Sequence, residues 1–439
     1  MAATPSKPQA ASAAPTAGRR GTPSGTVARK RPGQVPAGPP IARPETPTTP
    51  TPKLLRAWFT FTLLSLIAFT VLGVLSLTNA RSALAGAGES IGQLSRVEQV
   101  RTDVLRADAA AAHELLTGQD GDYGDTVAEA RATLVEAAAH SPSDASSLAE
   151  VNRELDAYTA KLEEARLGRG TPAGEEALVA AAAMLRTQVL PPLNTLVETN
   201  SGHVDASTAG VSRVPLALSG ILALAGLVGT ALTLSIRFRR LVNLGITAAI
   251  LLVAASWAIG LSALTTADTQ AQQVVHNEIV TFQESAAARG SAYDARAQEA
   301  LALIQRRTDP AADQPWSNAA DRTRTALERI PTTAAYDLHV AWDRYVEAHG
   351  DLRVLATQGE WDEAQRQIVQ DTGPAAGGRF VTFDTAVTDA MTNSSTQSRM
   401  LITSLASSVT LSTLVIGFGG LVAILCSWAG VRPRLQEYA

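Results

Sequence analysis

Two arginines lie two helical turns apart on one face of a segment that is otherwise apolar. A carboxylate can bind to such a guanidinium through two parallel hydrogen bonds, so Arg289 and Arg296 are candidate ligand-binding residues. In the alternative interpretation, both arginines flank a helix contact, pair with acids of a neighbouring helix and cover apolar surface with their stems. The stripe that carries them consists of Val275, Ile279, Phe282, Ala286, Arg289, Tyr293, Arg296, Ala300 and Leu303.

A similar pair, Arg101 and Asp108, lies two turns apart on an earlier helical segment. These two residues are also candidates for ligand binding. A polar contact inside a helical bundle is the alternative role for them.

Motifs for catalysis and metal binding are missing from the sequence. It has no Gly-rich phosphate loop ending in Lys-Ser or Lys-Thr, no histidine pair at metalloprotease spacing and no nucleophile elbow. His113 and His349 lie on or beside helix stripes, where we expect hydrogen-bonded core or interface imidazoles rather than metal ligands. Cys426 is the only cysteine and lies in the last apolar block, so the segments between the apolar blocks have no disulfide and no thiolate metal site. We therefore expect no catalytic residue, no metal, no cofactor and no enzyme activity.

Four apolar blocks account for the high hydrophobic content of 46%. Each has at least 20 residues without Asp, Glu, Lys, Arg or His, enough to cross about 30 Å of hydrocarbon, and buried core helices are the weaker alternative. Ion-coupled transporters usually carry a charge at membrane depth, so these blocks do not favour one. Small and hydroxyl residues at helical spacing, such as Gly226 and Gly229, suit helix contacts within one chain or in a homodimer. The predicted spans are residues 57–77, 214–236, 241–264 and about 400–428.

Charge predicts the orientation of these spans. Nine Lys or Arg precede the first span against Glu45 alone, and Arg237, Arg239 and Arg240 lie in the turn 237–240. Basic residues stay on the cytoplasmic side, so both termini, including the tail 429–439, and this turn are expected in the cytoplasm of a cell-membrane protein. The exported segments, 80–212 and 266–399, hold 20 acids against 10 bases and 19 against 12. Such acidic surfaces exclude nucleic acid as a partner.

The two exported segments read as a duplication. Landmarks recur at a nearly constant offset: Asp108 and Asp294, Tyr158 and Tyr345, Pro191 and Pro374. Apolar residues in each segment step by three and four, as in helices that pack against helices, and turn residues separate these stripes. The predicted fold is all-α, with four transmembrane helices and two tandem extracytoplasmic antiparallel four-helix bundles.

Residues 1–52 form a separate segment rich in Pro, Ala, Thr and Gly. They hold too little apolar surface to offset the entropy of ordering, so a disordered cytoplasmic tail is predicted. Its bases set topology and touch anionic lipid in one interpretation. In another, the stretch Glu45–Pro52 (ETPTTPTP) is a phosphorylation or docking segment for a Ser/Thr kinase.

The arrangement of span, helical bundle and span resembles the sensor half of chemoreceptors and histidine kinases, repeated twice. More narrowly, the segments 101–108 (RTDVLRAD) and 291–301 (SAYDARAQEAL) resemble an actinobacterial family of membrane sensors, the GlnX-like proteins. The resemblance extends over most of residues 55–439, although the turn 118–121 and the N-terminal tail depart from the family pattern. It implies a solute-binding lipoprotein outside and a Ser/Thr kinase inside as partners, and an amino-acid signal.

Together these features predict a sensor that relays an extracytoplasmic signal of glutamate, aspartate or glutamine type to a separate cytoplasmic kinase. The tail after the last span is too short for an output domain, which a separate protein would supply. A structural envelope protein and a transporter-accessory subunit remain as alternatives.

Overall fold

The computed structural model describes residues 51–119, 121–209, 212–238 and 243–436, all within one compact unit that spans residues 50–439. Every regular element in these ranges is a helix, which confirms the all-α prediction. The predicted disordered tail lies outside the described residues except for its last two positions, and so do Arg239 and Arg240 of the predicted turn.

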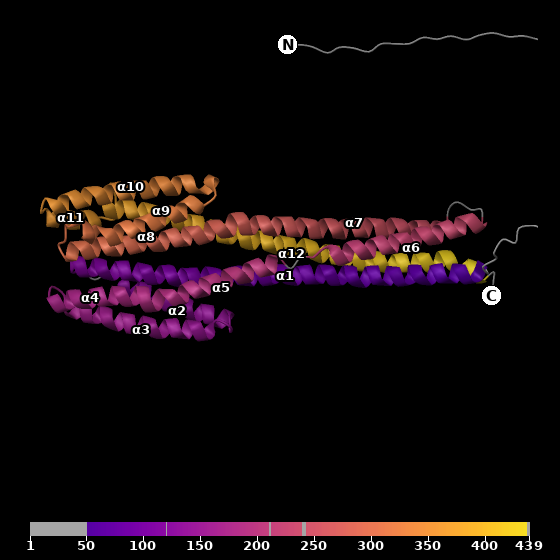
Figure 1. Ribbon diagram of the computed structural model, residues 1–439, viewed down its shortest axis with the longest axis horizontal. Coiled ribbons are helices and arrows are strands. Elements are labelled where there is room, and N and C mark those ends of the chain that lie inside the picture. Colours follow the sequence, from indigo (N-terminus) through magenta and orange to yellow (C-terminus); the bar gives the residue numbers. More distant parts are fainter. Residues whose placement is uncertain (1–50, 120, 210–211, 239–242, 437–439) are drawn as a thin grey trace, which may run out of the picture. The chain divides into compact units, whose positions relative to one another are not determined.

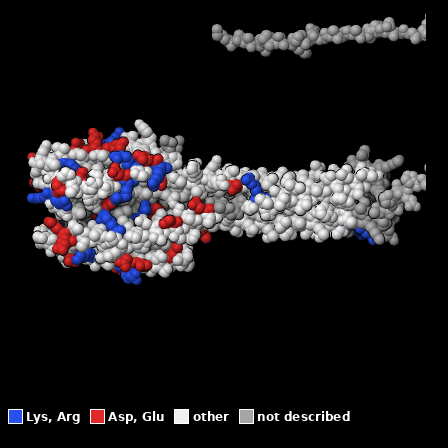
Figure 2. Space-filling model, in the orientation of Figure 1, with Lys and Arg blue, Asp and Glu red and all other residues white. Residues whose placement is uncertain are grey.

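Four helices are long and apolar enough to cross a membrane, and they run side by side over much of their length (Figure 1). They are α1 (Thr51–Thr117), α6 (Val214–Phe238), α7 (Leu244–Gln273) and α12 (Ala376–Gln436). Large apolar side chains on their outer faces are exposed, as lipid-facing residues must be, among them Leu64, Leu218, Leu251 and Phe418. Charged side chains are nearly absent from this part of the surface in Figure 2 and gather over the other helices. The chain is thus a multi-pass membrane protein.

Small and hydroxyl residues bring the membrane helices close together. The Thr62 hydroxyl of α1 donates to the carbonyl oxygen of Gly226 in α6 at 2.8 Å and lies 2.7 Å from the Thr230 hydroxyl. A side chain at Gly260 of α7 would collide with Ile416 of α12. Lipid provides no hydrophobic driving force between helices, so close packing and hydrogen bonds of this kind hold them together.

The first bundle, bundle 1, combines the second half of α1 with four further elements. These are α2 (Tyr123–His140), α3 (Ala145–Leu167), α4 (Pro172–Met184) and α5 (Leu190–Ala209), with a π-helical turn, η1 (Leu185–Val189), joining α4 to α5. The predicted stripe of α3 is its buried face, with Leu148, Val151, Leu155, Tyr158, Leu162 and Ala165 all inaccessible to solvent.

The second bundle, bundle 2, repeats this plan. Its first helix, α8 (Val280–Ile304), continues α7 through a second π-helical turn, η2 (Val274–Ile279). Then follow α9 (Pro310–Arg329), α10 (Thr332–Thr357), the short α11 (Trp361–Val369) and the first half of α12. The ranges 80–212 and 266–399 for the exported domains stay predictions, because helix bounds do not locate the bilayer surfaces.

Local sequence explains where the shorter helices begin. The hydroxyl of Thr171 caps α4 by accepting from the Gly174 amide at 3.2 Å, and Asp309 caps α9 by accepting from the Ala312 amide at 3.0 Å. A proline follows each cap, as is common at the first position of a helix. The turn before α4 needs Gly170, whose φ of +74° suits glycine.

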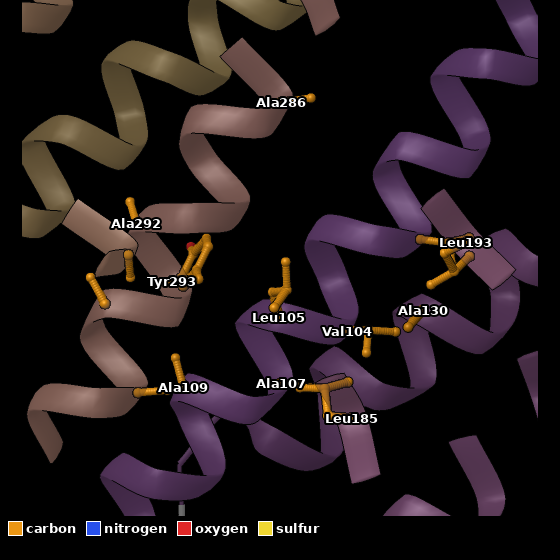
Figure 3. Close-up of a cluster of buried hydrophobic side chains, with 14 of the residues drawn as sticks. Val104, Leu105, Ala107, Ala109, Ala130, Leu185, Leu193, Ala286, Ala292 and Tyr293 are labelled. Atoms are coloured by element: carbon orange, nitrogen blue, oxygen red, sulfur yellow. The ribbon is translucent and has the colours of Figure 1, made fainter. Parts of the chain in front are cut away.

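The two bundles share one apolar core, because α1 packs against α8. In Figure 3, Leu105 and Ala109 point from α1 towards α8, while Val104 and Ala107 point into bundle 1. Gly290 of α8 allows this approach, since a Cβ at its position would lie 3.0 Å from Leu105 Cδ1. The first helices of the two repeats therefore form the contact between the bundles.

Replacing Gly290 with leucine should force α1 and α8 apart. Overpacking of this kind costs about 1–3 kcal/mol, so Gly290→Leu should lower the thermal unfolding midpoint of the protein in detergent. The matched control is Gly350→Leu, because Gly350 is exposed on α10 with nothing within 4 Å of its Cβ position. Equal midpoints for the two variants would show that the bundles do not pack through this face.

Candidate ligand site between the two bundles

A cavity of about 250 Å³ lies beside the contact between α1 and α8. Both repeats contribute residues to its wall, and most of the charged side chains in the wall form ion pairs with residues of opposite charge. We call it the Arg296 cavity. It is lined by Arg106, Ala109, Ala110, His113, Glu114, Gly121, Asp122, Tyr293, Arg296, Asp371, Phe380, Val381 and Asp384.

Arg296 is the best placed of the residues predicted from sequence. Only 9% of it is exposed, and its guanidinium lies 4.6 Å from the centre of the Phe380 ring. Its Nη2 has long contacts, 3.5 Å to the Ile368 carbonyl and 3.4 Å to Asp371 Oδ1, whereas Nη1 is buried without a partner in the described chain. A buried guanidinium with unused donors is suited to a carboxylate or another small anion.

His113 enters the same cavity from α1. Its Nδ1 is buried and finds no hydrogen-bond partner among the described residues, so the expectation of a hydrogen-bonded imidazole is wrong here. Burial, together with the charge of Arg296, lowers the pKa of His113. The imidazole therefore favours its neutral form and can still accept a proton. The sequence alone did not indicate that His113 lines a cavity, because a histidine on a helix stripe is usually a core residue.

The acids of the cavity are mostly engaged already. Glu114 accepts from the backbone amides of Gly121 at 2.9 Å and Tyr123 at 3.0 Å, which fixes the turn after α1. Asp384 is held by Arg289. Asp371 is different, because 64% of its side chain is exposed and its contact to Arg296 is weak. It remains available to a cationic group of a ligand.

Arg289 has the packing role that was its alternative interpretation. Its Nε donates to Asp384 Oδ1 at 2.6 Å and its Nη2 to Oδ2 at 3.2 Å, so α8 and α12 are joined by a two-pronged ion pair. Its guanidinium also lies 5.5 Å from the Tyr293 ring. The side chain is 8% exposed and both oxygens of Asp384 are bound to it, which leaves Arg289 as support for the cavity wall.

Arg101 lies away from the Arg296 cavity. It lines a second cavity of about 200 Å³ on the other side of the α1–α8 contact, together with Asp294 and Arg322. An ion pair of 3.0 Å joins Arg101 to the buried Glu98, and Arg322 pairs with Asp294. The cations of this second cavity are thus neutralised by acids that the protein itself supplies.

Asp108 is part of a buried ionic link between the bundles. It accepts a hydrogen bond of 2.9 Å from the Tyr158 hydroxyl and lies 3.7 Å from Arg186, whose guanidinium also pairs with Asp294 of bundle 2. Burial raises the pKa of Asp108, while Arg186 and Tyr158 oppose the shift. Asp108 and Arg101 do not contact each other through any hydrogen bond or ion pair in the described chain.

A larger cavity, of about 340 Å³, lies between the ends of α1, α3 and α8 and the starts of α4 and α11. Its charged residues Arg169, Glu175, Arg306 and Asp362 are all exposed, so water can satisfy them. It lacks the buried, unpaired donors of the Arg296 cavity and is the weaker candidate for a ligand site.

Bundle 2 also contains a buried polar cluster, centred on His349. His349 Nδ1 lies 2.6 Å from Glu299 Oε1 and Nε2 lies 3.2 Å from Asp313, with the Trp316 ring stacked on the imidazole at 3.5 Å. The Tyr345 hydroxyl donates to Glu299 at 3.2 Å. His349 is therefore the hydrogen-bonded core imidazole that its position on a helix stripe predicted.

This cluster predicts a pH-dependent contribution to stability. Burial lowers the pKa of His349, but the hydrogen bonds that its ring donates to Asp313 and Glu299 outweigh burial and raise the pKa above its ordinary value. The stabilisation is therefore full below about pH 6.5 and is lost as pH rises through the folded-state pKa. His349→Gln should lower the unfolding free energy by about 3 kcal/mol near pH 6 and by less at alkaline pH.

The measurement is the unfolding midpoint of the detergent-solubilised protein as a function of pH. His339→Gln on the same helix is the control, because His339 has no ion pair in the described part of the chain. It should change stability by at most about 0.5 kcal/mol at any pH. A constant effect of His349→Gln from acid to alkaline pH would contradict the assignment.

Part of the chain matches a known protein family. Residues 83–209 match the family model of an actinobacterial sensor domain, which runs from within α1 to the end of α5 and so covers bundle 1. No curated protein and no solved structure matches the chain. Over bundle 1 the chain is thus similar to an actinobacterial sensor domain, which fits a sensor or signal-transducer role for this multi-pass membrane protein.

Proposed function

We propose that the chain relays an extracytoplasmic amino-acid signal, of glutamate, aspartate or glutamine type, to a cytoplasmic Ser/Thr kinase and catalyses no reaction itself. The observation that carries the proposal is the buried, partly unpaired Arg296 in a cavity between two bundles. The resemblance to GlnX-like sensors adds the amino acid and the kinase.

The lining of the Arg296 cavity suits an amino acid. A ligand carboxylate would pair with the donors of Arg296 that have no partner among the described residues, and the mostly exposed Asp371 would bind the ligand's ammonium group. The rings of Tyr293 and Phe380, which meet edge to face with centres 5.1 Å apart, supply an apolar wall. A cavity of about 250 Å³ has room for a molecule of this size.

Helices that line the cavity continue towards the membrane. α1 and α12 each run as one helix from the cavity into a candidate span, and α8 joins its span through η2. A ligand that draws α1, α8 and α12 together would shift helices by about 1–2 Å, as in other allosteric transitions. The shift requires that the ligand bind two arrangements of the bundles with different affinity.

The proposed orientation places both bundles outside the cell and both termini in the cytoplasm, following the positive-inside rule. A solute-binding lipoprotein would then reach the bundles from outside, and the kinase would meet the N-terminal tail or the cytoplasmic helix ends. Membrane lipid and a second copy of the chain are further proposed partners. Envelope scaffolding and an accessory role in transport remain second candidates.

Cysteine labelling tests the orientation. In a Cys426→Ser background, a reagent that cannot cross the membrane should modify cysteine introduced at Ser146 or Tyr336, which are exposed on bundles 1 and 2. It should leave cysteine at Ser24 unmodified until the membrane is permeabilised. The reverse pattern would place the bundles in the cytoplasm and exclude this function.

Signalling is tested in cells by the phosphorylation of the kinase's substrate after addition of glutamate, aspartate or glutamine. Deleting the gene should remove the response, and Arg296→Gln should do the same while the protein stays at its normal level in the membrane. The reason is that Arg296 has few partners to lose, so its replacement removes ligand contacts and little packing.

Arg289→Ala is the matched control for this experiment. It leaves the Asp384 carboxylate without its ion-pair partner, which costs about 3 kcal/mol and should lower the amount of protein in the membrane. A full response in the deletion strain would remove the signalling proposal and favour the envelope scaffold. A full response in the Arg296→Gln strain would move the site elsewhere.

A further inference from the structure

His113 and Arg296 come from opposite repeats and line one cavity. His113 lies near the end of α1 in repeat 1, and Arg296 lies in the middle of α8 in repeat 2. Each has one nitrogen that is buried and lacks a hydrogen-bond partner in the described chain, Nδ1 of His113 and Nη1 of Arg296. A third buried atom of this cavity, Glu114 Oε2, also has no hydrogen-bond partner in the described chain and lies 3.7 Å from Arg166. Buried polar atoms are rarely left unpaired, so the two nitrogens indicate that a ligand group completes them.

We propose that His113 and Arg296 together clamp the anionic group of the ligand and that His113 takes up one proton when the anion binds. The clamp deepens the proposed function, since it concerns the same cavity, but it requires only that the cavity bind an anion. The proton comes from solvent and goes to the free ring nitrogen of His113. The imidazolium then donates to the anion beside Arg296.

The groups around His113 explain why a proton does not already reside there. Burial and the charge of Arg296 from α8 both disfavour the imidazolium and lower the pKa of His113, and together they outweigh Asp371, Glu114 and Asp122, which favour it. The other charged or titratable groups that line the cavity are Arg106, Tyr293 and Asp384. An anion between His113 and Arg296 would reverse the repulsion between the two cations.

None of the cavity's own acids can replace the ligand anion. Glu114 accepts both backbone amides through Oε1, and its Oε2 lies 3.7 Å from Arg166. Asp384 is held by Arg289, and Asp122 is exposed. Arg106 is already paired, with Glu129 at 3.2 Å. Asp371 is mostly exposed and reaches only Nη2 of Arg296. The position between the imidazole and Nη1 is therefore left for an anion from outside the chain.

Proton uptake makes the binding of anions dependent on pH. Between the pKa of His113 in the free protein and its higher pKa in the complex, affinity should fall about tenfold for each unit of pH rise. A neutral ligand group would not produce this dependence. The clamp therefore favours ligands that present a carboxylate or a similar anion to the space between the two repeats.

The test follows His113 by NMR in the full-length protein, with ¹³C-labelled histidine, in lipid nanodiscs. The probes are sodium acetate and sodium L-glutamate, with sodium chloride at equal ionic strength as the reference. His113→Gln identifies the signal. Either carboxylate should raise the pKa of His113 by about two units, as expected for an opposite charge nearby, and leave the His339 signal unchanged.

Arg296→Gln and Arg296→Lys separate the clamp from a general effect of salt. Both variants should reduce the shift, and the lysine variant keeps the charge in case the glutamine variant fails to fold. Calorimetry of glutamate binding in two buffers of different ionisation enthalpy should show uptake of about one proton, which His113→Gln abolishes.

If neither carboxylate changes the pKa of His113, the clamp is wrong. It is also wrong if both Arg296 variants show the same pKa shift as the unsubstituted protein. The clamp and the signalling role can fail separately. A shifted pKa with no kinase response in cells contradicts the proposed function and leaves the clamp standing. A kinase response without the shift removes the clamp alone.

Discussion

The contact between α1 and α8 is the interaction on which the rest of the structure depends. Small residues on both helices, among them Ala109 of α1 and Gly290 of α8, let the two first helices of the repeats approach closely, and Leu105 fills the space that remains. The two bundles thereby share one core instead of having two separate ones. His113 and Arg296 line the same cavity only because of this contact.

Small residues let the helices pack closely but do not determine how they are aligned along one another. Buried charged residues determine this alignment. Arg186 connects Asp108 of bundle 1 to Asp294 of bundle 2, and Arg289 ties α8 to α12. Buried ion pairs add little net stability, because desolvation offsets their attraction. A slipped arrangement, however, would leave charges buried without partners, at a cost of several kcal/mol. These pairs therefore act mainly by excluding other alignments of the repeats.

Much of the fold could be predicted from the sequence, for clear physical reasons. The absence of charge over 20 or more residues predicts four spans, and the described chain has four helices long and apolar enough to be spans. The three-four spacing of apolar residues predicts the stripe of α3, which is buried in the structure. The face that α8 turns to α1 could not be predicted, because α8 is buried on nearly all sides and its periodicity is weak. The role of His113 depends on that face. For the same reason, the sequence predicted the same role for Arg289 and Arg296. In the structure their roles differ, because Arg289 forms an ion pair with Asp384.

The equivalent tyrosines of the two repeats show how a duplicated fold became asymmetric. Tyr158 donates to Asp108 in bundle 1, but Tyr345 donates to Glu299, one and a half turns after the equivalent Asp294. Asp294 is thereby free to leave the core of bundle 2 and pair with Arg186 and Arg322 between the bundles. One of the two cavities beside the α1–α8 contact is thus closed to anions by the protein's own carboxylates. In the other, Arg296 faces a mostly exposed Asp371 and keeps Nη1 without a hydrogen-bond partner in the described chain.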